Sequence, residues 1–253
     1  MTLVLLHSAG ATPEIWDRVR GCLVGVPVIA PPLPGRADAG EPADDVAVHG
    51  DAVLRVMDRE GIDRAAIGGH SLGGAVALWL AINHPRRVAG LGLVNAGGRM
   101  RVAPQMLEAL PDGLEPILDM VALSNFPSGS PSDWVEERRK GYRAVGGATL
   151  LADLTACDRF DVLDRLWEIR CRTQVLAGSE DSLTPPRHAK MMAERISAAR
   201  YVEYAGAGHM LPIERAAEIA GELAVLWAST LDGPTRGRGA PASGGAGSLP
   251  RVG

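Results

Sequence analysis

The sequence predicts an α/β fold, with a mostly parallel sheet of about six strands, helices on both faces and a helical cap. Short apolar runs bounded by turn-forming residues alternate along the chain with segments of helical length and spacing. Strands that are apolar throughout and separated by helices imply a parallel sheet covered on both faces. The alternation stops after Asn95 and resumes near residue 172, with only helical patterns between.

The elements before and after this interruption follow in regular order. Strands are expected at residues 3–6, 26–30, 64–68, 88–94, 172–177 and 200–204. Helices are expected at residues 15–24, 44–60, 72–83, 186–196 and 213–231. Within the interruption, residues 106–123 have helical periodicity, and Pro111 and Pro116 are expected to break them into shorter helices.

These patterns divide the chain into three parts. Residues 1–96 and 165–231 form the predicted α/β core, and residues 97–164 form an inserted helical layer. Residues 232–253 are rich in glycine and proline and have almost nothing apolar to bury, so we expect a disordered tail.

Composition excludes several classes of function. The 253 residues are 46% hydrophobic and 22% charged with a net charge of −4, which fits a soluble globular chain without the basic surface of a nucleic-acid binder. The longest apolar stretch, residues 72–82, is well short of the roughly 18 residues that favour a membrane span. Residues 1–6 lack the basic start and the length of a signal peptide, and three cysteines suit neither a disulfide framework nor zinc. We therefore expect a cytoplasmic protein without metal or cofactor.

The segment Gly69-His70-Ser71-Leu72-Gly73 fits the pattern G-x-S-x-G, which places a serine nucleophile on a sharp turn between a strand and a helix. A predicted strand precedes this serine and a predicted helix follows it. Ser71 would therefore project its hydroxyl at the carboxyl edge of the sheet, near a helix N-terminus that favours developing negative charge. The alternative is a glycine-rich helix start in which Ser71 only caps the helix.

A serine hydroxyl needs a base to accept its proton and a third group to orient that base. Among the six histidines, His209 follows a predicted strand in a loop at the same sheet edge as Ser71. Asp181, in the loop after the strand 172–177, is the predicted orienting acid, and its neighbour Glu180 is the rival. The other common position for the acid, after Val94, holds only Asn95.

With these motifs the chain resembles the α/β-hydrolase fold superfamily, and within it the small serine carboxylesterases. His7-Ser8-Ala9-Gly10 and Leu33-Pro34-Gly35 are similar to turns of that family. The resemblance implies an oxyanion hole made by the backbone N–H groups of Ala9 and Leu72. Ser8 stands where the family usually has glycine, and His70 adjoins the nucleophile but would point away from it; these two are the candidate substrate-binding residues.

The resulting hypothesis is hydrolysis of carboxylic esters with small to medium acyl groups through an acyl-enzyme, with no cofactor. The fold also hosts thioesterases, lactonases, carbon–carbon hydrolases and cofactor-free haloperoxidases, which stay open as alternatives, and a non-catalytic ligand-binding member is the third. The expected partner is a small-molecule ester, with no nucleic acid and no membrane. The charged segment 134–140 could dock an acyl carrier protein, although a solvated helix face is the simpler interpretation.

Overall fold

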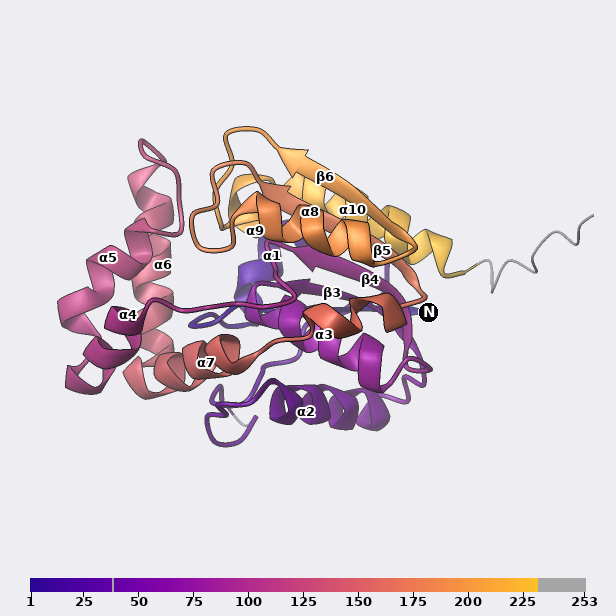
Figure 1. Ribbon diagram of the computed structural model, residues 1–253, viewed down its shortest axis with the longest axis horizontal. Helices are drawn as coiled ribbons and strands as arrows, with labels where there is room; N and C mark the ends of the chain where they lie inside the picture. The colour runs from indigo at the N-terminus through magenta and orange to yellow at the C-terminus, as the bar shows by residue number, and fades with distance from the viewer. Residues whose placement is uncertain (38, 232–253) are drawn as a thin grey trace, which may run out of the picture.

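A computed structural model describes residues 1–37 and 39–231, so the predicted tail at 232–253 lies outside the described residues. Six parallel strands form one sheet in the order β2-β1-β3-β4-β5-β6 (Figure 1). The strands are β1 (Thr2–Leu6), β2 (Val28–Ile29), β3 (Ala65–His70), β4 (Val88–Val94), β5 (Arg172–Gly178) and β6 (Ala199–Tyr204). The predicted α/β fold with about six parallel strands is confirmed.

Helices cover both faces of this sheet in two separate hydrophobic layers. Val19 of α1 and Leu223 of α10 belong to one layer, and Val53 of α2, Leu78 of α3 and Met192 of α8 belong to the other. The helices of the core are η1 (Pro13–Trp16), α1 (Asp17–Cys22), α2 (Val46–Arg59), α3 (Leu72–Asn83), α8 (Pro186–Arg195), α9 (Leu211–Glu214) and α10 (Ala216–Ser229).

The last helix of the core differs from the expected element. The single helix predicted at 213–231 is divided at Arg215, whose φ of −136° lies outside the helical region. The preceding residue, Glu214, uses its carboxylate to bind two backbone N–H groups of the loop before α9. His49 of α2 is fully buried, with Nε2 3.0 Å from the carbonyl oxygen of Ala43.

The segment 97–164, called the cap below, is helical and lies beyond the carboxyl edge of the sheet (Figure 1). Pro111 and Pro116 each lie in a short 3-10 helix that interrupts the α-helical path. Arg99 and Asp161 form an isolated antiparallel bridge where the chain enters and leaves this layer. The elements are α4 (Pro104–Ala109), η2 (Leu110–Asp112), η3 (Glu115–Ile117), α5 (Leu118–Leu123), α6 (Ser132–Val145) and α7 (Gly147–Arg159), followed by η4 (Leu163–Glu168).

The parallel arrangement brings the loops after five strands, β1, β3, β4, β5 and β6, to one edge. Leu6 is paired with Gly69, His70 with Val94, and Gly178 with Tyr204, so the strands end at similar heights. Each of these loops carries polar residues considered in the sequence analysis. Within the described ranges, no helix is both long and apolar enough to cross a membrane.

Candidate active site

Ser71 lies on the turn between β3 and α3 in a strained backbone conformation, with φ of +54° and ψ of −114°. The turn is tight because Gly69 lacks a side chain: a Cβ there would lie 2.1 Å from the carbonyl oxygen of Gly73. The Ser71 hydroxyl makes no capping hydrogen bond to the helix. This geometry contradicts the helix-cap alternative and leaves the hydroxyl available at the sheet edge.

The loop after β1 passes directly over the first turn of α3. A Cβ on Gly73 would lie 2.1 Å from the carbonyl oxygen of Leu6, so only glycine permits this approach. The backbone N–H groups of Ala9 and Leu72 have no hydrogen-bond acceptor among the described residues. Ala9 lines the same cavity as Ser71, and Leu72 directly follows the serine. Two N–H donors beside a serine hydroxyl are suited to bind a developing oxyanion.

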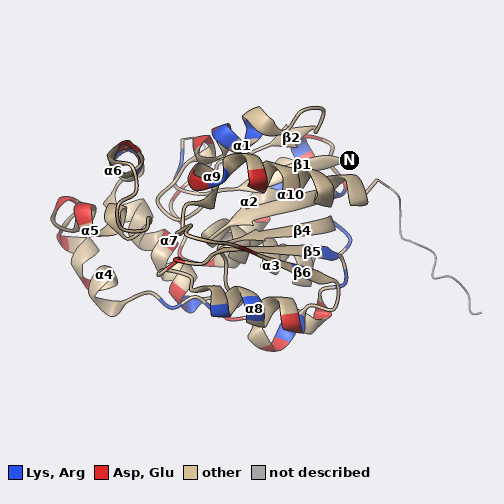
Figure 2. Ribbon diagram, turned by 90° about the horizontal axis from the view of Figure 1, so that it is seen from above, with Lys and Arg blue, Asp and Glu red and all other residues tan. Residues whose placement is uncertain are grey.

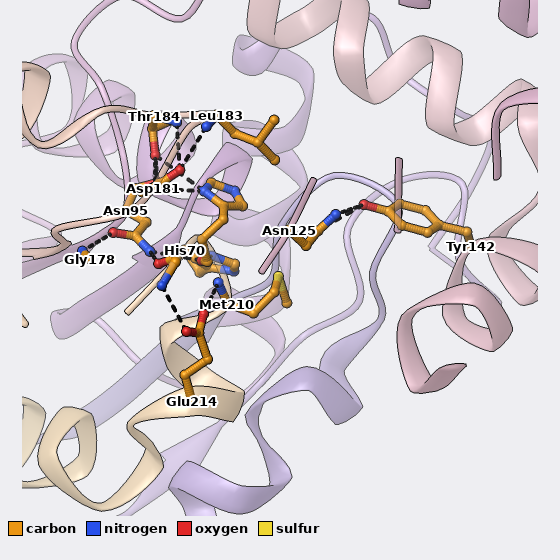
Figure 3. Close-up of polar contacts among 12 residues, drawn as sticks. His70, Asn95, Asn125, Tyr142, Gly178, Asp181, Leu183, Thr184, Met210 and Glu214 are labelled. Atoms are coloured by element: carbon orange, nitrogen blue, oxygen red, sulfur yellow. Dashed lines mark hydrogen bonds and ion pairs between the residues drawn. The ribbon is translucent and has the colours of Figure 1, made fainter. Parts of the chain in front are cut away.

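His209 and Asp181 are hydrogen-bonded at the same edge, with Nδ1 of His209 2.8 Å from Oδ2 of Asp181. Asp181 Oδ1 accepts hydrogen bonds from the backbone N–H groups of Leu183 and Thr184, both at 2.9 Å (Figure 3). The Thr184 hydroxyl donates to Oδ2 at 2.6 Å. Glu180 is exposed, so the structure brings Asp181, and not its rival, to the histidine.

The Asp181 carboxyl is held in its charged form although it is buried. Burial alone would raise its pKa, but His209 nearby and the hydrogen bonds from His209 and Thr184 more than offset this, so the pKa of Asp181 lies below its ordinary value. Because the carboxylate is charged, His209 Nδ1 carries a hydrogen and Nε2 is free to accept a proton. That is the tautomer which a base for Ser71 requires.

Asn95 holds the histidine loop and the acid loop together. Its amide nitrogen donates to the carbonyl oxygens of Gly208 and His209, both at 2.8 Å, and its amide oxygen accepts the N–H of Gly178 at 2.8 Å. The Asn95 carbonyl oxygen also lies 2.9 Å from the Thr184 hydroxyl oxygen. Its φ of +43° is one that asparagine tolerates better than most residues. In the sequence, Asn95 is notable only because this position offers no carboxylate for the triad. In the structure, it holds the loops of Asp181 and His209 in place.

Two further groups fix the backbone on either side of His209. The Glu214 carboxylate accepts the N–H of Gly208 at 2.8 Å and the N–H of Met210 at 2.9 Å. From the cap, the carbonyl oxygen of Asn125 accepts the His209 N–H at 3.0 Å. Burial raises the pKa of Glu214, although the two hydrogen bonds oppose this. Asn125 did not stand out in the sequence, because its partner lies in another layer of the fold.

His70 contacts the backbone of His209 from within the core and does not line the cavity that contains Ser71. It is fully buried, and its Nε2 lies 2.7 Å from the carbonyl oxygen of His209. The two imidazole rings are tilted, with centroids 4.9 Å apart. His70 is not among the residues that line the cavity at Ser71. This corrects the prediction that His70 contacts the substrate: as the last residue of β3, it points into the core instead.

A cavity of about 140 Å³ lies between the sheet edge and the cap and contains both Ser71 and His209. Ser71 is 9% and His209 5% exposed, and no hydrogen bond joins their side chains in the described part of the chain. Catalytic hydrogen bonds are often long before substrate binds. Ser8 also lines the cavity, and its hydroxyl has no hydrogen-bond partner there. Apolar cap side chains complete the lining, among them Met106, Val121, Leu150 and Leu154.

The cap is bonded to the loop that carries Ala9. The N–H of Gly10 donates to Oδ2 of Asp153 in α7 at 2.9 Å. Arg36 forms a bidentate pair with the same carboxylate, and its Nε donates to the carbonyl of Ala11 at 2.9 Å. The side chains of Arg36 and Asp153 are 3% and 1% exposed, so this is a buried ion pair with its hydrogen bonds satisfied.

His7 fixes the start of the same loop as a neutral imidazole. Its Nε2 accepts the N–H of Leu33 at 3.1 Å, so Nδ1 carries the hydrogen and donates to the carbonyl of Ser8 at 3.0 Å. Burial, reinforced by the charge of Arg36, lowers the pKa of His7 to about 3. In the described ranges no group of three or more His, Cys, Asp or Glu residues is arranged to hold a metal ion.

Comparison with known proteins agrees with this fold. Residues 3–222 match the alpha/beta hydrolase family, and the chain belongs to that family. A pimeloyl-acyl-carrier-protein methyl ester esterase of Aromatoleum aromaticum is 30% identical over 229 residues, which are 82% of this chain and 90% of that protein. The chain is therefore a member of a hydrolase family with an esterase among its relatives.

Solved structures agree in fold over nearly the whole chain. A hydrolase from Pseudomonas aeruginosa PA01 is 28% identical, with a TM-score of 0.80 over 91% of this chain and 89% of that one. An enol-lactonase from Burkholderia xenovorans LB400 has a TM-score of 0.83 over 91% of each chain, and at 22% identity this is a likeness of fold.

Proposed function

We propose that this protein is a serine carboxylesterase with a Ser71–His209–Asp181 triad. The observation that carries the proposal is the meeting of three features in one cavity: Ser71 on its strained turn, His209 oriented by a buried carboxylate, and the unpaired N–H group of Ala9. Serine hydrolysis requires these parts in this arrangement, and no single one of them would be diagnostic.

In the proposed reaction, Ser71 Oγ attacks the ester carbonyl carbon while His209 Nε2 accepts the hydroxyl proton. The carbonyl oxygen becomes an oxyanion bound by the N–H groups of Ala9 and Leu72. The tetrahedral intermediate collapses, the bond to the alcohol oxygen breaks, and His209 returns its proton to the leaving alcohol. Water then attacks the acyl-enzyme with His209 again accepting a proton, and Ser71 and a carboxylic acid are released.

The size of the cavity favours esters with small to medium acyl groups. A cavity of about 140 Å³ is smaller than the roughly 300–1,000 Å³ of sites that take drug-sized ligands. Its lining is mostly apolar and comes largely from the cap, which suits an uncharged acyl chain. Thioesters and lactones present the same carbonyl chemistry and are the alternative substrates.

An acyl carrier protein remains a candidate partner, because the related esterase named above acts on a carrier-bound substrate. The segment 134–140 is a poor docking surface for it. Arg138 is 3% exposed and lies over the ring of Tyr142, and Arg139 is bonded to Asp119 at 2.7 Å. Comparing kcat/KM for a carrier-bound and a free acyl methyl ester would test this partner.

The proposal is tested with p-nitrophenyl esters of increasing acyl length, alongside a thioester and a lactone. Ser71→Ala should abolish hydrolysis while the protein stays folded, and an organophosphate should label Ser71 in a mass-spectrometric peptide map. Asp181→Asn should lower kcat by about 10⁴-fold, whereas the neighbouring control Glu180→Gln should change it little. A folded Ser71→Ala protein with most of the parent activity would refute the triad.

A further inference from the structure

A second cleft opens beside the candidate active site, with a volume of about 420 Å³. It lies between the connection that leads from β4 to α4 and the start of α8. Leu183 and Thr184 line both this cleft and the cavity that holds Ser71, as do Met100 and Arg101. The two hollows are therefore neighbours that share part of their lining.

The lining of this cleft is strongly basic. Arg99, Arg101, Arg187 and His188 line it, and no aspartate or glutamate does. Figure 2 shows basic residues along α8 and along the connection to α4, on the same side of the molecule. Outside the lining, Asp161 lies 3.5 Å from Arg99 and 3.7 Å from Arg101, so one carboxylate is shared by two guanidinium groups.

Arg187 forms no ion pair with any described residue. Its neighbour His188 lies close to the arginines. The pKa of His188 is lowered mainly by partial burial and further by the charges of Arg187 and Arg99. A neutral imidazole and a free guanidinium can both donate hydrogen bonds. Guanidinium groups in particular match the geometry of carboxylates and phosphates.

The position of the cleft relative to His209 indicates which part of a substrate it faces. The leaving alcohol must lie near His209, because this residue returns the proton to it. Leu183 and Thr184, which line both hollows, belong to the loop that carries Asp181, on the histidine side of the first cavity. Ser8 and Ala9, on the oxyanion side, line only the first cavity.

We infer that the cleft binds a negatively charged group, a carboxylate or a phosphate, on the alcohol part of the ester. The inference rests on the proposed esterase function and adds a substrate class to it: an uncharged acyl group under the cap, joined to an anionic alcohol at the arginines.

The experiment compares three butyrate esters: phenyl butyrate, 3-carboxyphenyl butyrate and 3-(phosphonooxy)phenyl butyrate. The measured quantity is the ratio of kcat/KM for each anionic ester to that for the neutral ester. Arg187→Gln should lower this ratio by about threefold to tenfold, as expected for loss of one exposed charge contact, and Arg99→Gln should lower it in the same direction. The control is Lys190→Gln, also on α8 but outside the cleft and paired with Glu203 at 3.0 Å, and it should leave the ratio unchanged.

A binding measurement separates this inference from the proposed function. Phenyl phosphate and benzoate are titrated calorimetrically into the Ser71→Ala protein, with phenol as the neutral probe. Tighter binding of either anion, weakened by Arg187→Gln, supports the cleft even if no ester is hydrolysed, and the preferred anion shows which group is bound. Hydrolysis of phenyl butyrate with equal ratios in the parent, Arg187→Gln and Lys190→Gln proteins would overturn the inference and leave the esterase proposal standing.

Discussion

Around Ser71 the chain is held by backbone packed against backbone, whereas around His209 it is held by side chains bonded to backbone. Gly69 and Gly73 allow contacts that a single Cβ would fill. On the other side, Asn95 and Glu214 together make five hydrogen bonds to the loops that carry the acid and the histidine. We therefore expect added side-chain atoms to damage the region around Ser71, and removed side-chain atoms to damage the region around His209.

The largest effect is expected from Gly73→Ala. The new Cβ would lie 2.1 Å from a backbone oxygen that cannot move without displacing β1, so we expect a loss of about 10³-fold or more in kcat/KM and a lower melting temperature. The matched control is Gly221→Ala in α10, where nothing lies within 4 Å of the new Cβ. This control should gain up to about 1 kcal/mol in the free energy of unfolding. Equal activity of the two variants would contradict the packing argument.

Asn95→Ala tests the second side by removing a bonded amide. It leaves the Gly208 carbonyl oxygen and the Gly178 N–H without this partner, while the His209 carbonyl oxygen keeps its hydrogen bond with His70. We expect a loss of about 3 kcal/mol in unfolding free energy and at least about a tenfold fall in kcat. KM should change less than kcat, because Asn95 does not line the cavity. The exposed Asn83→Ala is the control. A normal kcat in a destabilised Asn95→Ala protein would limit this residue to a structural role.

His7, in the loop that carries Ala9, should make the free energy of unfolding depend on pH. Its folded pKa of about 3 is below the unfolded value of about 6.5, so the unfolded chain binds more protons between these values, and stability is lost as pH falls below about 6.5. From pH 7.5 to pH 5 this amounts to about 2 kcal/mol. His7→Gln should reduce the pH dependence of denaturant unfolding by that amount. An NMR titration of the His7 ring between pH 5 and pH 8 would contradict this.

The smallest effect is expected from Ser8→Gly. The Ser8 side chain lines the cavity and its hydroxyl has no hydrogen-bond partner among the described residues, so its removal breaks no hydrogen bond. More space beside the oxyanion should broaden acceptance of bulky acyl groups by a few fold and leave the rate on acetate esters nearly unchanged. The measurement is kcat/KM over an acyl series from acetate to palmitate. An unchanged profile would exclude Ser8 from the determinants of acyl size.

The residues that sequence reasoning could find are those with local signals. Ser71 has a motif and a strand before it, and Asp181 and His209 each follow a strand, so parallel topology alone brings them to one edge. The position of Asn95 directly after β4 places it at the same sheet edge, but its role depends on hydrogen bonds to residues more than 80 positions away in the sequence. His70 was a substrate-binding candidate because it adjoins Ser71 in sequence, but in the structure it is buried against the His209 carbonyl and lies outside the cavity lining.

The cap was harder to interpret. Its helices and their proline breaks follow from periodicity, but the bond from Gly10 to Asp153 joins residues 143 positions apart, and no pattern in either segment predicts it. The same holds for Asn125, whose backbone carbonyl accepts the His209 N–H. A backbone acceptor leaves no trace in the side-chain sequence.

The buried pair of Arg36 and Asp153 limits how this enzyme could be recombined with its relatives. Asp153 belongs to the cap and Arg36 to the core, and both are almost completely buried. A chimera that receives a foreign cap without an acid at this position would bury an uncompensated guanidinium, at a cost of about 3–5 kcal/mol. New specificities are therefore more accessible through point changes among the cavity-facing side chains of the cap than through exchange of the cap as a module.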